Sequence, residues 1–120
     1  LRANADAGLT APNLIAAFAE VAARQGDKPL LIENGRVALR YSELMAKAGQ
    51  VAARLQALGV RPGDRVLAQI DKSPDAVLLY LGALTAGAIW VPLTTAYLGP
   101  ELAYFIDDAT PKVIVCRSPD

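Results

Sequence analysis

The sequence predicts an α/β fold in which a partly parallel sheet is covered by helices and preceded by an N-terminal β-hairpin. Three observations support this fold class. Two strand-like runs flank Asn34-Gly35, strand and helix patterns alternate from residue 65 to residue 116, and the later strand runs are continuously apolar. Continuous apolar strands separated by helices are typical of a parallel sheet that is buried on both faces.

The chain is expected to begin with a flexible lead-in over residues 1–12, which are mostly small or polar, followed by a folded portion over 13–120. Asn13 is a candidate N-cap for a first helix that ends at Gly26. The apolar face of this helix, at helical spacing, comprises Leu14, Phe18, Val21 and Ala22.

A hairpin is predicted next, because Asn34-Gly35 separates the strand-like runs 30–33 and 36–40. Both positions of a two-residue hairpin turn need positive φ, which Asn and Gly adopt most readily.

A second helix follows, with Ser42 as its expected N-cap and Gly59 as the left-handed residue beyond its end. Val60 is then placed to pack back on the last helical turn. The apolar stripe of this helix comprises Leu44, Ala48, Val51, Ala52 and Leu55.

Three strands are predicted in the second half, over 65–70, 89–93 and 112–116, separated by two helices. Ser73 caps the first of these helices, which runs to about Ala86, is apolar nearly all round and should be buried on more than one side. Its mid-helix glycine, Gly82, indicates close packing against a neighbour. The second helix starts at Pro100-Glu101, and its inward residues are Leu102, Phe105, Ile106 and Ala109. Pro92 belongs at a strand end or at a sheet edge, because it has no N–H.

Composition argues against several classes of function. Twelve basic and twelve acidic residues balance, so neither nucleic acid nor a membrane surface is expected as a partner. There is no histidine and one cysteine, which removes the commonest general base, the usual zinc clusters and any intrachain disulfide. No glycine-rich phosphate loop is present. The single cysteine and the lack of a secretion signal favour the cytoplasm.

Few side chains stand out as chemically active. Asp107-Asp108 is interpreted as a solvated helix end, since adjacent helical residues point apart. Cys116 closes an apolar strand and is expected to be a small buried hydrophobe. Trp90 and Tyr41 are expected to be packing residues.

The ends of the parallel strands offer one candidate site. In open parallel sheets ligands bind beyond the carboxyl ends of the strands, and here those ends carry Lys72 and Ser73, Thr94 and Thr95, and Arg117-Ser118. A cation, hydroxyls and a helix N-terminus would suit an anion. Ordinary turn and cap roles are the simpler interpretation of the same residues.

Two stretches resemble core motifs of the adenylate-forming enzymes. They are Arg40-Tyr41-Ser42-Glu43-Leu44 and the segment 84–94, Leu-Thr-Ala-Gly-Ala-Ile-Trp-Val-Pro-Leu-Thr. The phrase Gly-Val-Arg-Pro-Gly-Asp-Arg-Val at 59–66 is also typical of that family. Thr94 stands where the family usually has Asn or Asp, and we expect it to lose a turn-capping side chain.

Within the family the chain looks most like malonyl-CoA synthetases, in Lys72-Ser73, 79–81, 95–97, 101–109 and 111–116. The resemblance implies the N-terminal part of the large domain of an acid–CoA ligase. Such an enzyme joins malonate or methylmalonate to coenzyme A through an acyl-adenylate, using ATP and Mg²⁺. The family's phosphate loop and catalytic lysine have no counterpart in these residues, so the chain alone is expected to be inactive, without cofactors of its own, and to need the remainder of the enzyme.

Two other interpretations remain open from the residues. One is a stand-alone α/β module that binds an anion or nucleotide at the strand ends. The other is an interaction fragment that self-associates through an uncovered sheet surface.

Overall fold

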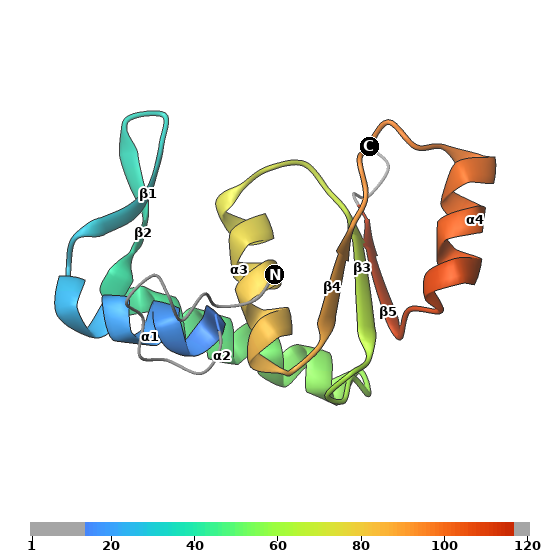
Figure 1. The fold of residues 1–120 in the computed structure, drawn as a ribbon. Helices are drawn as coiled ribbons and strands as arrows, with labels where there is room; N and C mark the ends of the chain where they lie inside the picture. The colour runs from blue at the N-terminus through green and yellow to red at the C-terminus, as the bar shows by residue number, and fades with distance from the viewer. Residues whose placement is uncertain (1–13, 117–120) are drawn as a thin grey trace, which may run out of the picture.

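The computed structural model describes residues 14–116, which form two sheets joined by two packed helices (Figure 1). The elements are α1 (Leu14–Gln25), β1 (Pro29–Glu33), β2 (Arg36–Arg40), α2 (Tyr41–Ala57), β3 (Arg65–Gln69), α3 (Pro74–Thr85), β4 (Ile89–Pro92), α4 (Gly99–Ala109) and β5 (Val113–Cys116). The predicted fold class is confirmed, and element ends differ from the predicted ones by about one residue. Asn13, Arg117, Ser118 and the boundary at residue 12 lie outside the described residues.

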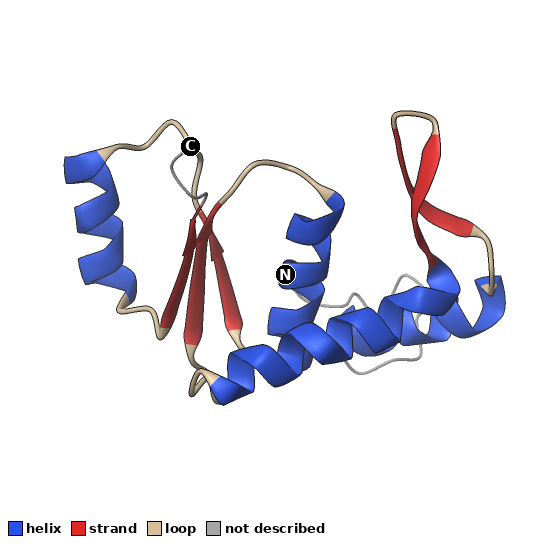
Figure 2. Cartoon of the chain, turned by 180° about the vertical axis from the view of Figure 1, so that it is seen from behind, coloured by secondary structure: helices blue, strands red, loops and turns tan. Residues whose placement is uncertain are grey.

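The hairpin is an antiparallel pair of β1 and β2, closed at Glu33 and Arg36. Asn34 and Gly35 have φ of 52° and 75°, as the two-residue turn requires. The hairpin stands at one end of α2, on the far side of α3 from the parallel sheet (Figures 1 and 2). A first apolar cluster lies at its base, where α1, α2 and α3 meet it, and its buried members are Ala22, Leu39, Leu44, Ala48 and Leu81.

The predicted stripe of α2 is confirmed, because four of its five residues are buried and Val51 is half-buried. The end of α2 is also as predicted. Gly59 has φ of 97°, its N–H donates to the Gln56 carbonyl at 2.9 Å, and the N–H of buried Val60 donates to the Leu55 carbonyl at 3.0 Å. These two bonds form a Schellman ending, which satisfies carbonyls that the helix leaves free.

Helices α2 and α3 approach closely at Gly82. A Cβ added there would lie 2.6 Å from Val51 Cβ, a distance that packed carbon atoms do not reach, and 3.2 Å from the Ala48 carbonyl oxygen, which is a tight contact. The predicted close packing is therefore confirmed. As expected of an apolar helix, α3 contributes to both apolar clusters, through Leu81 to the first and Ala83 to the second.

The second sheet is parallel, with β3 between β4 and β5. Val66 lies beside Trp90 on one side and Val113 on the other. These three residues face α2 and α3, where they join a second apolar cluster whose buried members are Leu55, Val60, Val66, Ala83 and Ala88. Val66, Leu67 and Ala68 are all buried, as a central strand of a parallel sheet should be.

Helix α4 lies on the opposite face of the sheet from α3 (Figure 2). Its half-buried residues are the four predicted to face inward, while none of its residues is fully buried. Cover on this face is incomplete, since Ile89 and Ile114 remain 50% and 43% exposed.

Two predictions about a helix cap and about burial were wrong. Ser42 is not the N-cap of α2, because Arg40 takes that position and Ser42 Oγ instead donates to Asp27 Oδ1 at 3.0 Å. Cys116 is exposed rather than buried, because it is the last residue of β5, which is an outer strand of the sheet. Asp107 and Asp108 are exposed, and Trp90 and Tyr41 pack against the apolar clusters, as expected.

Across residues 14–116, no helix combines the length and the apolar character needed to cross a bilayer.

The contact at Gly82 can be tested by substitution. Gly82→Ala should lower the free energy of unfolding by about 1–3 kcal/mol, because the new methyl group overlaps Val51. Gly49→Ala is the matched control in the interior of α2, where an added Cβ meets nothing within 4 Å. The free energy of unfolding of that variant should rise by about 0.5–1 kcal/mol, because alanine has a higher helix propensity than glycine. Urea unfolding measures both, and equal effects of the two variants would contradict the close contact.

Candidate functional site

The carboxyl edge of the parallel sheet is organised around Gln69, the last residue of β3. Its side-chain Nε2 donates to the Thr94 carbonyl at 3.0 Å and to the Tyr97 carbonyl at 2.7 Å. These bonds fasten the turn after β4 to the central strand. The sequence analysis did not predict this role of Gln69. Nothing in the sequence shows whether a polar side chain at a strand end points to solvent or hydrogen-bonds a neighbouring loop.

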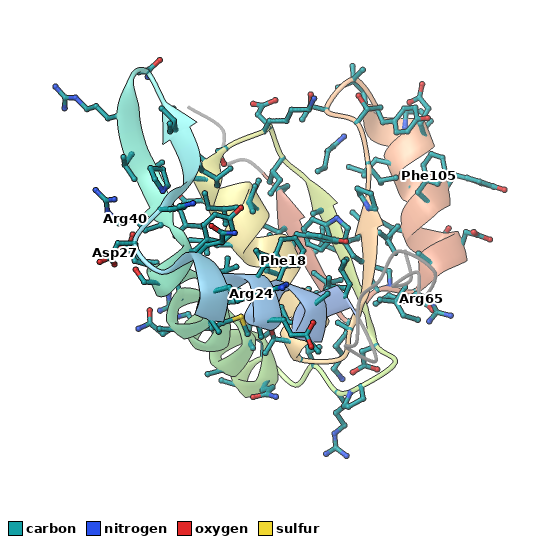
Figure 3. The ribbon with its side chains drawn as sticks, turned by 60° about the vertical axis from the view of Figure 1, so that its left-hand side comes forward. Phe18, Arg24, Asp27, Arg40, Arg65 and Phe105 are labelled. Atoms are coloured by element: carbon teal, nitrogen blue, oxygen red, sulfur yellow. The ribbon has the colours of Figure 1, made fainter. Side chains whose placement is uncertain are left out.

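The turn that Gln69 holds is also stabilised by hydrogen bonds within the turn and by a contact with α4. Thr94 Oγ1 accepts the Ala96 N–H at 3.2 Å, so the expectation that threonine loses the turn-capping role was wrong. The Tyr97 N–H donates to the Thr94 carbonyl at 3.2 Å, and its ring stacks on Phe105 of α4, with centroids 5.1 Å apart. Figure 3 shows Phe105 on α4.

Lys72 and Ser73 lie in a different setting from Thr94 and Thr95. They line a hollow of about 270 Å³ between α3 and the hairpin, together with Leu31, Ile32, Glu33, Pro74 and Val77. Ser73 Oγ accepts the Ala76 N–H at 3.0 Å and caps α3, as predicted. Lys72, Thr94 and Thr95 are exposed. The capping bonds fit the turn and cap roles, and an anion site at these four residues stays a prediction.

A larger hollow of about 700 Å³ adjoins the same helix start. Ser73, Pro74 and Asp75 form one side, and the hairpin residues Glu33, Asn34, Arg36, Val37 and Ala38 form the other. Its charged residues are two acids and one base, so its charge gives no preference for an anion.

The first motif, 40–44, forms the junction between β2 and α2. The Arg40 N–H donates to Glu43 Oε1 at 2.9 Å, and Arg40 Nη1 donates to the Asp27 carbonyl at 2.7 Å. Figure 3 shows Arg40 beside Asp27 at the base of the hairpin. The Tyr41 and Ser42 N–H groups donate to the carbonyls of Lys28 and Gly26. The motif therefore ties the start of α2 to the end of α1.

The second motif, 84–94, sets the turn from α3 into β4. The Ala88 N–H returns to the Ala83 carbonyl at 2.9 Å, and the Gly63 N–H donates to the Gly87 carbonyl at 3.0 Å. Gly87 has φ of 78°, and an added Cβ would meet Pro62 Cβ at 3.2 Å. The motif thus joins the starts of β3 and β4.

In the part of the chain that the structure describes, two side chains have a shifted pKa. The Arg40 N–H bond, aided by Lys47 at 3.2 Å, lowers the pKa of Glu43. Burial raises the pKa of Tyr80. Within residues 14–116, no group of three or more His, Cys, Asp or Glu could hold a metal ion.

Comparisons with known proteins agree on one family. Residues 18–120 match the family described as AMP-binding enzyme. The long-chain-fatty-acid–CoA ligase FadD13 of Mycobacterium tuberculosis is 34% identical over 83 residues, which cover 69% of this chain and 16% of that protein.

Solved structures give the same result. ATP-bound MatB from Rhodopseudomonas palustris is 47% identical over 82% of this chain and 21% of its own, with a TM-score of 0.68. A four-domain nonribosomal peptide synthetase bound to AMP and glycine is 31% identical over 88% of this chain and 8% of its own, with a TM-score of 0.78. The chain therefore spans about a fifth or less of these relatives.

Removing the Gln69 amide should loosen the turn after β4. Gln69→Ala is expected to cost about 1–3 kcal/mol of unfolding free energy, because two hydrogen bonds are lost, and to speed hydrogen exchange at the Tyr97 amide. Gln69→Glu is the control that keeps the shape of the side chain. It should lose at least as much unfolding free energy as Gln69→Ala, because a carboxylate cannot donate to the two carbonyls. Unchanged exchange in both variants would show that the turn holds without Gln69.

The hydrogen-bonded Glu43 at the β2–α2 junction should make the free energy of unfolding depend on pH. A carboxyl whose pKa is lowered by folding stabilises the fold above its ordinary pKa of 4.5, and this contribution is lost as pH falls through the lowered value. Glu43→Gln should therefore unfold at lower urea than the parent at neutral pH, with the difference shrinking in acid. Glu101→Gln, the same change in the first turn of α4, is the control. A difference that grows in acid would contradict the assignment.

Proposed function

Because this chain belongs to the AMP-binding enzyme family, we propose that it forms the N-terminal portion of an ATP-dependent acid–CoA ligase. The proposed substrate is malonate or methylmalonate, which such an enzyme converts with ATP and coenzyme A to acyl-CoA, AMP and pyrophosphate. The observation that carries the proposal is the 45% and 47% identity to two structures of MatB, a malonyl-CoA synthetase. The fatty-acid ligase and the peptide synthetase share 34% and 31%.

In this proposal the chain supports the active site and does not perform the chemistry. Its two family motifs build the β2–α2 junction and the α3–β4 turn through hydrogen bonds that run within the chain. Among residues 14–116, no group of three or more His, Cys, Asp or Glu side chains could hold Mg²⁺. The proposal places ATP, Mg²⁺ and coenzyme A with the rest of the enzyme.

The proposed reaction needs charge neutralisation on the phosphates, and in this proposal the rest of the enzyme supplies most of it. Attack of a carboxylate on the α-phosphate brings two anions together, and it needs cations or backbone N–H groups aimed at the phosphates. Lys72 is exposed beside the start of α3 and is the one residue of the predicted anion site with a positive charge.

The test measures the pyrophosphate that the full gene product releases from ATP when a carboxylic acid substrate is added. Malonate or methylmalonate should be used at least about tenfold more efficiently than a long-chain fatty acid or an amino acid. The 120-residue chain alone, assayed beside it, should give no pyrophosphate exchange above background.

Two outcomes would contradict the proposal in different ways. A preference for fatty or amino acids would overturn the substrate and leave the adenylate-forming class. Exchange catalysed by the 120-residue chain would overturn the view that the chemistry lies elsewhere in the enzyme.

A further inference from the structure

The turn of the β1–β2 hairpin carries an exposed Asn34-Gly35 pair. Residues 32–37 are all exposed, and the turn projects beyond α2 and α3 (Figure 1). Asparagine is one of the thermolabile residues, because its side-chain carbonyl can be attacked by the backbone nitrogen of the next residue. Glycine as that next residue has no Cβ to hinder the attack, so this pair is suited to form a cyclic succinimide.

The two reacting groups have no protecting contacts. Among residues 14–116, neither the Asn34 side-chain amide nor the Gly35 N–H has a hydrogen-bond partner. A Cβ built on Gly35 would meet no atom within 4 Å, so the space beside its nitrogen is open. Neither packing nor hydrogen bonding therefore holds the pair away from the reaction.

The closed turn itself opposes the attack. Asn34 and Gly35 have φ of 52° and 75°, the backbone of a tight two-residue hairpin turn. In such a turn the Gly35 nitrogen and the Asn34 Cβ lie on opposite sides of the Asn34 Cα–C bond. The side-chain carbonyl cannot then reach the nitrogen, so the ring closes only after the peptide between the two residues has rotated and the turn has opened.

Opening of the turn meets little resistance from packing. No residue from 32 to 37 belongs to either apolar cluster, and a hollow of about 700 Å³ separates the turn from the start of α3. Leu39, at the base of the hairpin, is fully buried in the first cluster. Segments with few buried contacts open locally at a small cost in free energy. The tip can therefore open while the base of the hairpin stays packed.

We propose that Asn34 is a site of spontaneous deamidation, and that local opening of the hairpin turn sets its rate. In the open turn the Gly35 nitrogen bonds to Asn34 Cγ and loses its proton, the bond from Cγ to the side-chain nitrogen breaks, and ammonia leaves. Water then cleaves the succinimide. Cleavage between Cγ and the Gly35 nitrogen gives aspartate at position 34, and cleavage between the main-chain carbonyl carbon and that nitrogen gives isoaspartate.

Both products change the hairpin. Isoaspartate adds a methylene group to the backbone, and a two-residue turn of that length no longer matches the pairing of Glu33 with Arg36. Either product adds a carboxylate to the hollow beside α3, whose charged residues are Glu33, Arg36 and Asp75. The reaction needs water alone, so the inference does not depend on the proposed function.

Peptide mapping of the full gene product by mass spectrometry tests the site. During storage at mildly alkaline pH, aspartate and isoaspartate should accumulate at position 34, because the attacking nitrogen must lose its proton. The native rate should be at least about tenfold lower than the rate in urea, since only the opened turn reacts. Val37→Ala weakens the exposed cross-strand contact with Ile32. It should raise the native rate roughly 1.5- to 5-fold and leave the rate in urea unchanged.

The control variant is Asn34→Gly. Glycine adopts the positive φ of this position and has no side-chain amide, so the variant should keep the hairpin and show no conversion in the same peptide. An unmodified Asn34 in the native protein, at a time when the sample in urea is converted, would overturn the site. Equal rates in the native protein and in urea, or equal native rates for the parent and Val37→Ala, would overturn control by opening of the turn.

Discussion

The close approach of α2 and α3 at Gly82 is the contact on which the rest of the structure depends. Helix α3 lies between the hairpin and the parallel sheet, and it contributes to the apolar cluster on each side. No side chain larger than hydrogen fits between Val51 and the backbone at position 82. The distance between these helices therefore fixes how both sheets are placed, including the carboxyl edge that Gln69 organises.

The two family motifs act through backbone geometry. The Glu43 carboxylate accepts the Arg40 N–H at the start of α2, and the Arg40 side chain donates to the Asp27 carbonyl just beyond the end of α1. Gly87 allows Pro62 to come close, so that β3 and β4 begin side by side. Both motifs are held by hydrogen bonds within the chain, and they set where the neighbouring helices and strands begin.

Much of the fold could be predicted because its signals are local. The Asn34-Gly35 turn, the ending of α2 at Gly59 and the Ser73 cap each follow from a few neighbouring residues. Three features that the sequence did not predict are decided by a partner that is distant in sequence. Asp27 draws Ser42 away from a cap role, Gln69 reaches the turn at Thr94, and the exposure of Cys116 depends on which strand lies outermost. For the same reason the four residues predicted to form one anion site do not lie together. Lys72 and Ser73 line a hollow beside the hairpin, whereas Thr94 and Thr95 lie in the turn after β4.

The strand order has a consequence for the way the protein is made. β3 is the central strand, yet it is the first of the three to be synthesised, and its two neighbours follow in turn on opposite sides. A ribosome releases the chain from its N-terminus, so β3 can pair with β4 once α3 and β4 have emerged, and it can pair with β5 later on its other edge. The sheet can thus grow outward from its oldest strand during translation, without any strand having to insert between two that are already joined.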